Sequence, residues 1–291
     1  MARTPVAQRG SGAGGAGHRI DFDREHARGA GAYDGVMGEW WMERTSDPPH
    51  QRAYRKISKV VRAMAPAEPR TITDYSCGGG DLLIQLADRF PDARLRGIDA
   101  SSRMLARAVG RVGAADGRLD RPIEFIRSRL PDPRLPGHTE DLVVYTFPDH
   151  TRSDSPQVPT NDRRVARAIS RMADPEDEDP VAEDPREVFE DLCWARAVAI
   201  NLRHLLRHGG TVVRVDYADC GIADMTRVSR LRGAFEEGSL NRAVAGVRCS
   251  SLFRLARSHF FRSKVCEDVF HQTGVEDDKR GGFLVTELRA A

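Results

Sequence analysis

The sequence has few of the features that mark secreted, membrane-spanning or zinc-binding proteins. Its five cysteines stand apart at positions 77, 193, 220, 249 and 266, so they form neither a C-x-x-C pair nor the spacing of a zinc site. No apolar run approaches the roughly 20 residues that cross a bilayer, and the N-terminus lacks the basic region and apolar core of a secretory signal. We therefore expect no bound metal and a soluble protein of the cytoplasm.

The sequence also lacks a strong excess of charge of either sign. It has 45 basic and 43 acidic side chains, which give a net charge of +2, and its only lysines stand at positions 56, 59, 264 and 279. Such a balance provides no broad electrostatic footprint for nucleic acid. We expect a small-molecule partner and neither a membrane nor a nucleic acid, while self-association as a homo-oligomer stays open.

Two short segments carry most of the information in the chain. Residues 71–83 read TITDYSCGGGDLL, a β-type run that ends in small residues and continues as an amphipathic helix. Residues 97–101 read GIDAS, so a second strand ends on Asp99. The glycines let the backbone turn sharply and let a ligand lie against main-chain amides. Asp99 is placed to accept hydrogen bonds from ribose hydroxyls, and this layout predicts a nucleoside-type cofactor site.

The residues around the glycines discriminate between cofactors. Leu83 stands where a dinucleotide-binding G-x-G-x-x-G motif has its third glycine, and Asp81 would repel a phosphate. The P-loop pattern G-x-x-x-x-G-K followed by Ser or Thr is absent. Two carboxylates, those of Asp74 and Asp81, flank the turn and favour a positively charged ligand, such as the ammonium and sulfonium groups of S-adenosylmethionine.

The segment DYSCGGGD, residues 74–81, resembles the first motif of the class I S-adenosylmethionine-dependent methyltransferases, which usually reads D-x-G-x-G-x-G. Asp74, Gly78 and Gly80 match that motif, and residues 97–101 are similar to the second motif of the family. Ser76 replaces the first glycine, so we expect residue 76 to do without a positive φ or to leave a ligand less room.

The resemblance implies S-adenosylmethionine as the cofactor, bound at the carboxyl ends of the strands. The family usually carries an acid here that binds the adenine amino group, but the sequence from Phe125 to Leu130 has none. We therefore expect backbone groups or Ser128 to bind the adenine. We assign cofactor binding to Asp74, Ser76, Cys77, Gly78, Gly80, Asp99, Ala100, Met104, Ser128, Arg129 and Tyr145.

The acceptor side of the site is less constrained by the sequence. Methyl transfer depends mainly on alignment of the acceptor, but an oxygen acceptor gains from a general base, for which Asp149 and His150 are the catalytic candidates. His150 reads equally well as a surface-loop histidine, and two tryptophans near the N-terminus read equally well as anchors of a helix. The residues assigned to the acceptor are Tyr33, Trp40, Trp41, Phe147 and His259.

The expected fold class is α/β, with a Rossmann-like, mainly parallel seven-stranded sheet, helices on both faces, an N-terminal helical cap and inserted helices. Strands are predicted near residues 70–75, 94–99, 122–127, 140–146 and 210–216, and closing strands at 264–271 and 282–288. Helices are predicted near residues 80–90, 101–112 and 187–207.

The same patterns suggest how the chain is divided. Residues 1–18 are expected to be a disordered tail, residues 19–69 a helical cap and residues 70–291 the methyltransferase core. Within the core we expect a loop insertion at 151–186, which contains an acidic run, and a helical insertion at 222–260.

The predicted function is transfer of a methyl group from S-adenosylmethionine to a small-molecule acceptor, such as an intermediate of secondary metabolism. Two alternatives stay open. A methyltransferase of RNA or protein would carry clustered arginines at the mouth of its cleft. A non-catalytic S-adenosylmethionine-binding protein is suggested by Ser76 and by the missing acid on the adenine side.

Overall fold

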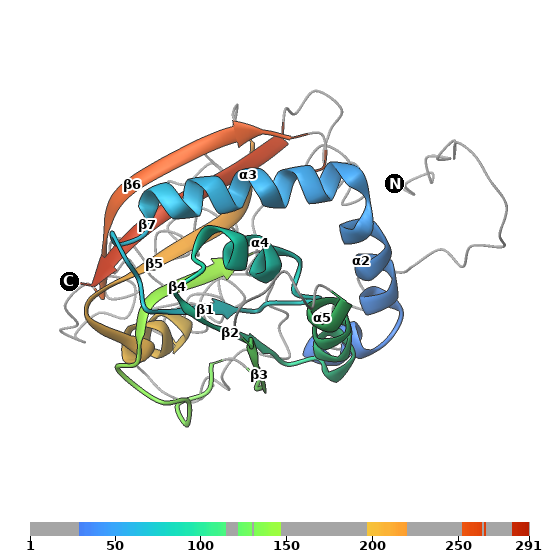
Figure 1. The fold of residues 1–291 in the computed structure, drawn as a ribbon, viewed down its shortest axis with the longest axis horizontal. Helices are drawn as coiled ribbons and strands as arrows, with labels where there is room; N and C mark the ends of the chain where they lie inside the picture. The colour runs from blue at the N-terminus through green and yellow to red at the C-terminus, as the bar shows by residue number, and fades with distance from the viewer. Residues whose placement is uncertain are drawn as a thin grey trace, which may run out of the picture.

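The structure is a computed structural model that describes residues 29–114, 122–129, 131–146, 197–219, 252–263, 265 and 281–290. Over these residues the chain builds a seven-stranded sheet in the order β3-β2-β1-β4-β5-β7-β6, shown in Figure 1. The strands are β1 (Thr71–Tyr75), β2 (Arg94–Asp99), β3 (Glu124–Arg127), β4 (Glu140–Thr146), β5 (Leu206–Asp219), β6 (Phe253–Arg262) and β7 (Gly281–Ala290).

Strand β7 is the one that reverses direction in this sheet. It pairs antiparallel with β5 and β6, whereas β1 to β5 pair with one another in parallel. This arrangement confirms the predicted mainly parallel α/β fold. The chain leaves β1 toward β2 and β3 and then returns to β4 on the other side of β1. Ligand crevices in such sheets open at this switch in strand order, beyond the carboxyl ends of the strands.

Helices cover both faces of the sheet. Helix α3 (Pro48–Met64) has buried residues at intervals of three and four, and with helix α4 (Asp81–Arg89) it packs on one face around Val144. In Figure 1, α3 lies over the side of the sheet that carries β5 and β7. The helix that includes residues 197–205 packs on the opposite face, where Leu202 joins a second core.

The N-terminal part of the described chain forms a cap, made of the 3₁₀ helix η1 (Gly29–Asp34) and helix α2 (Val36–Ser46). Figure 1 shows α2 beside helix α5 (Ser102–Ala114), on the side of the sheet toward which β1 points. An ion pair joins Glu39 of α2 to Arg103 of α5. The cap therefore lies at the carboxyl end of the sheet, where a crevice is expected.

The far edge of the sheet differs from the prediction. Strand β6 occupies residues 253–262, most of which the sequence analysis assigned to an inserted helix. Val265, inside the predicted strand 264–271, is helical. The predicted tail at 1–18, the loop insertion at 151–186 and the rest of the helical insertion lie outside the described residues.

A β-bulge explains why periodicity did not reveal β6. The pairing of β6 with β7 shifts register between Leu255 and Arg257. An inserted residue turns the following side chains to the other face of a sheet. Phe253 accordingly joins one core and Phe261 the other, so the aromatic residues of this segment do not show the alternation of a regular strand.

Strand β5 also begins earlier than predicted. The preceding helix ends at Leu205 and the strand starts at Leu206, although the helix was predicted to reach residue 207 and the strand to begin at residue 210. Gly209 has a φ of +79° within an irregular stretch of pairing between β4 and β5. The glycine therefore accommodates a bulge in the strand rather than a helix terminus.

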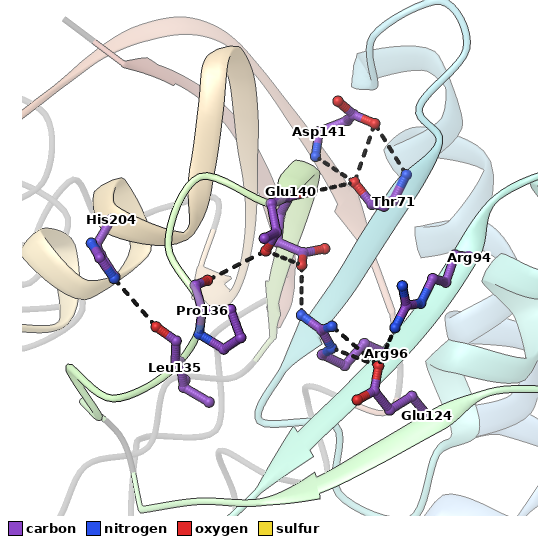
Figure 2. A network of polar contacts seen from close by, with 10 residues as sticks. Thr71, Arg94, Arg96, Glu124, Leu135, Pro136, Glu140, Asp141 and His204 are labelled. Carbon is purple, nitrogen blue, oxygen red and sulfur yellow. Dashed lines mark hydrogen bonds and ion pairs between the residues drawn. The ribbon is translucent and has the colours of Figure 1, made fainter.

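A polar network ties together the starts of the parallel strands, as Figure 2 shows. The guanidinium group of Arg96 donates to Glu124 at 3.1 Å and to the buried carboxylate of Glu140 at 2.7 Å. The carboxylate of Asp141 accepts from the main-chain N–H of Thr71 at 3.1 Å. These contacts hold strands β1, β2, β3 and β4 together at the end of the sheet opposite the expected crevice.

Among the described residues, none of the helices combines the length and the hydropathy that crossing a bilayer requires.

Candidate functional site

The turn between β1 and α4 has three residues in the left-handed region. Ser76 has a φ of +77°, Gly78 of +51° and Gly80 of +77°. Gly80 precedes α4, and a β-carbon there would come within 3.0 Å of Ala108 in α5. A β-carbon on Gly78 would meet nothing within 4 Å, so this glycine borders open space. A ligand can therefore approach the main chain of Gly78 directly.

Ser76 excludes the first of the two alternatives expected for residue 76, that it would do without a positive φ. It adopts the conformation that the missing glycine would have had, which costs a non-glycine residue about 1 kcal/mol. Its hydroxyl group donates to the main-chain carbonyl of Thr146 at 3.0 Å, at the end of β4. This hydrogen bond joins the ends of β1 and β4 and offsets part of the cost of the strained backbone.

Asp99 lies at the end of β2 with both carboxylate oxygens fixed. One oxygen accepts from the main-chain N–H of Gly78 at 2.8 Å, and the other accepts from the N–H of Ser101 at 2.9 Å. Burial raises the pKa of Asp99, and main-chain hydrogen bonds oppose that rise. A carboxylate has about four acceptor positions, so this partly exposed group can accept further hydrogen bonds from the hydroxyl groups of a ligand.

The two carboxylates expected to flank the turn have different surroundings. Asp74 is fully buried and neither of its oxygens has a hydrogen-bond partner, and burial, reinforced by the charge of Asp99, raises its pKa to about 8. Asp81 was expected to face a positively charged ligand. It is instead paired with Arg111 at 2.5 Å and accepts from Gln51 of α3 at 2.6 Å. Asp81 therefore fastens α3 and α5 to α4.

The end of β3 carries a carboxylate that the sequence analysis missed. The buried hydroxyl group of Ser128 donates to Asp132 at 2.6 Å, and the main-chain N–H of Ser128 donates to the carbonyl of Asp99 at 2.9 Å. Hydrogen bonds from Arg134 hold the pKa of Asp132 well below its ordinary value. Asp132 lies just beyond the segment searched for an acid, and only the turn after β3 brings it back to Ser128.

Several residues predicted to bind the cofactor direct their side chains into the protein. The ring of Tyr145 packs edge-on against Tyr75, with 5.3 Å between the ring centroids, in a core under the sheet. The sulfur of buried Cys77 lies against Gly97, and the side chain of Met104 is also buried. These three side chains support the strand ends from beneath. Ala100 is partly exposed and Arg129 is exposed.

Two of the three aromatic residues of the cap pack against each other, and one of them also contacts α3. Trp40 stacks on Trp41 with 5.7 Å between ring centroids, and Trp41 meets His50 edge-on at 6.2 Å. These contacts match an anchoring role for the tryptophans. The main-chain carbonyl of Tyr33, by contrast, accepts from the hydroxyl group of Ser101 at 3.1 Å, so this residue reaches the loop that carries Asp99.

Of the remaining predicted site residues, one lies far from the glycine turn and three fall outside the described residues. His259 is exposed on the edge strand β6, four strands away from β1, which corresponds to about 19 Å across the sheet. Phe147, Asp149 and His150 lie outside the described residues. The structure thus gathers Gly78, Asp99 and Ser128 at neighbouring strand ends and leaves His259 apart from them.

Comparison with known proteins points to one kind of enzyme. A family model described as a methyltransferase domain matches residues 72–172, which include the glycine turn, Asp99 and Ser128. Trans-aconitate 2-methyltransferase of Streptomyces avermitilis is 28% identical over 211 residues, covering 59% of this chain and 78% of that protein. Demethylmenaquinone methyltransferase of Porphyromonas gingivalis is 28% identical over 121 residues, covering 40% of this chain and 44% of that protein. A solved SAM dependent methyltransferase from Aquifex aeolicus aligns over 86% of this chain and 96% of its own, with 12% identity and a TM-score of 0.48.

Proposed function

Because the chain belongs to the class I S-adenosylmethionine-dependent methyltransferases and uses S-adenosylmethionine as its methyl donor, we propose that it methylates a small organic acceptor. The observation that carries this proposal is the position of the cap, whose residue Tyr33 contacts the loop of Asp99. A cap fastened beside the proposed donor site would restrict access to it and would favour a compact acceptor over a polymer. The relatives named for trans-aconitate and demethylmenaquinone support the same class of acceptor.

The residues at the strand ends fit such a donor. We propose that Asp99 accepts hydrogen bonds from the sugar hydroxyls through its free acceptor positions. The open space beside Gly78 would receive the amino-acid part of the donor, close to main-chain atoms. Ser128, whose hydroxyl hydrogen is held by Asp132, would keep its oxygen lone pair for the adenine amino group.

The buried carboxylate of Asp74 has a long-range electrostatic role in this proposal. Its oxygens have no hydrogen-bond partners and its pKa of about 8 keeps it mostly protonated at neutral pH, so a cation bound nearby would favour its ionised form. When bound, S-adenosylmethionine supplies a sulfonium-activated methyl group for an in-line displacement. The protein then has to align the acceptor with that methyl group. Asp149 and His150 stay our candidates for a general base if the acceptor atom is oxygen.

A second candidate function is methylation of RNA, and one feature of α3 favours it. The helix contains no acidic residue, and its basic side chains are all exposed at intervals that place them along one face. These residues are Arg52, Arg55, Lys56, Lys59 and Arg62. Such a row could bind phosphates, and binding would then weaken steeply with salt.

Two measurements test these proposals in sequence. Calorimetry with S-adenosylhomocysteine tests the donor site directly, because binding needs no knowledge of the acceptor. Incubation with methyl-labelled S-adenosylmethionine and fractionated cell extract then identifies the acceptor class. We expect label in the small-molecule fraction. Label confined to RNA would favour the second candidate, and label confined to protein would contradict both.

A further inference from the structure

We infer that Asp34, in the cap, is a positioning residue for the donor site: it holds Ser101, and through Ser101 it sets the orientation of Asp99. The inference rests on the proposed contact between Asp99 and the donor sugar. It adds a role to a residue that lies 65 positions before Asp99 in the sequence and that no motif marks.

The contacts form a continuous chain from the cap to the glycine turn. The hydroxyl group of Ser101 donates to the carboxylate of Asp34 at 2.7 Å, and the main-chain N–H of Ser101 donates to Asp99 at 2.9 Å. The other oxygen of Asp99 accepts from Gly78 at 2.8 Å. Ser101 is 1% exposed, so bulk water cannot replace Asp34, and the main-chain carbonyl of Tyr33, at 3.1 Å, is the other acceptor within reach of its hydroxyl group. The two carboxylates thus hold one buried serine from opposite sides.

Asp34 is also built into the start of α5. The same carboxylate oxygen that receives Ser101 accepts from the hydroxyl group of Ser102 at 3.2 Å and from the main-chain N–H of Arg103 at 3.1 Å. The first turn of a helix has unpaired N–H groups and a positive end of its dipole, so a carboxylate there is stabilised. Burial raises the pKa of Asp34, but these hydrogen bonds outweigh it and lower the pKa below its ordinary value. Asp34 is therefore ionised wherever the cap is docked at neutral pH.

Ser101 in turn orders the helix that follows Asp99. Its oxygen accepts from the main-chain N–H of Met104 at 3.1 Å, the hydrogen bond of a helix N-cap. A serine that caps α5, donates to Asp34 and binds Asp99 through its main chain has little freedom to rotate. Without the Asp34 carboxylate the hydroxyl group has only the more distant, uncharged carbonyl of Tyr33 as its acceptor, at 3.1 Å, and the loop that presents Asp99 loses its charged support.

The contact makes the docking of the cap and the binding of the donor interdependent. If Asp34 improves the orientation of Asp99 for the sugar, a bound sugar must by linkage strengthen the docking of Asp34. The ion pair between Glu39 and Arg103 fastens the same cap but makes no hydrogen bond to Ser101. Glu39 therefore separates a general effect of cap docking from the specific effect of the Asp34 contact.

The experiment measures the Kd of S-adenosylhomocysteine by calorimetry for the full chain and for Asp34→Ala, Ser101→Ala and Glu39→Gln. We expect about a tenfold higher Kd for Asp34→Ala and Ser101→Ala, the size typical of a lost hydrogen bond to a charged group. Glu39→Gln should stay within about twofold of the wild type, because an exposed ion pair contributes little. Asp34→Asn, which keeps an acceptor oxygen, should recover part of the loss.

A double-mutant cycle with Asp99→Asn distinguishes a positioning role of Asp34 from a general effect on the structure of the cap. If Asp34 acts through Asp99, then Asp34→Ala should cause no further loss of affinity in the Asp99→Asn background. An equal loss in both backgrounds, or unchanged affinity of Asp34→Ala, would overturn the positioning role while leaving the donor site intact. A wild-type chain that binds no S-adenosylhomocysteine would overturn the donor assignment itself, and the role of Asp34 with it.

Discussion

Asp74 and Asp99 end neighbouring parallel strands as a pair of carboxylates with unequal surroundings, the first buried without partners and the second held by two main-chain N–H groups. Burial and the charge of Asp99 raise the pKa of Asp74 to about 8. Below that pH Asp74 is mostly protonated while Asp99 supplies the negative charge, and a cation that binds near the glycine turn would favour release of the Asp74 proton.

The raised pKa of Asp74 predicts how stability depends on pH. An unfolded aspartate releases its proton near pH 3.9, whereas folded Asp74 keeps it until about pH 8, so stability is lost as the pH rises between these values. The loss approaches about 1.4 kcal/mol per pH unit and stops above the folded pKa. In Asp74→Asn this component is absent. Urea unfolding at pH 5 to 8 should show the variant gaining stability relative to the wild type, and parallel curves would contradict the prediction.

The same carboxylate should make donor binding depend on pH. A bound sulfonium favours ionised Asp74, so binding of S-adenosylmethionine releases a proton and its affinity rises with pH up to about 8. S-adenosylhomocysteine lacks the sulfonium charge and should respond less. We expect the preference for S-adenosylmethionine over S-adenosylhomocysteine to grow between pH 6 and pH 8 in the wild type and to stay flat in Asp74→Asn. Calorimetry with both ligands measures it, and a constant preference in the wild type would argue against this role.

Ser76 offers a test of backbone strain at the turn. Ser76→Ala loses the hydrogen bond to Thr146 and keeps the φ of +77°, whereas Ser76→Gly loses the same bond and removes the strain. We expect the glycine variant to be more stable than the alanine variant by about 1 kcal/mol, after the larger entropy of an unfolded glycine is counted. Thermal or chemical unfolding of the two variants gives the difference. Equal stabilities would mean that the left-handed conformation at residue 76 carries no cost.

Two glutamates of the network at the strand starts differ in exposure, and their variants can be compared by the free energy of unfolding. Glu140 is 3% exposed in its ion pair with Arg96, and Glu124 is 42% exposed in its pair with the same arginine. Glu140→Gln should lower the free energy of unfolding by about 2 kcal/mol because it removes the buried charged partner of Arg96 and leaves only the more exposed Glu124. Glu124→Gln should cost less than about 1 kcal/mol. Both variants should bind S-adenosylhomocysteine as the wild type does, because the network lies at the opposite end of the sheet.

Local sequence signals determined which parts of the fold and the site were predictable. Glycines next to a strand end, and an acid at the end of the following strand, identify β1, β2 and the turn because their meaning depends on a few adjacent residues. Strand β6 escaped prediction because its bulge reverses which face each aromatic residue occupies. Asp34 and Asp132 escaped it because only the folded chain brings them to Ser101 and Ser128.

The most direct test of the account is the affinity of S-adenosylhomocysteine for the wild type and for Asp99→Ala, measured side by side by calorimetry. Asp88→Ala, which removes an exposed carboxylate from α4, serves as the control and should bind as the wild type does. We predict that Asp99→Ala loses about 1 to 3 kcal/mol of binding free energy, through its lost charge-assisted hydrogen bonds to the sugar. Equal affinity of the wild type and Asp99→Ala would show that Asp99 does not hold the donor and would contradict the account.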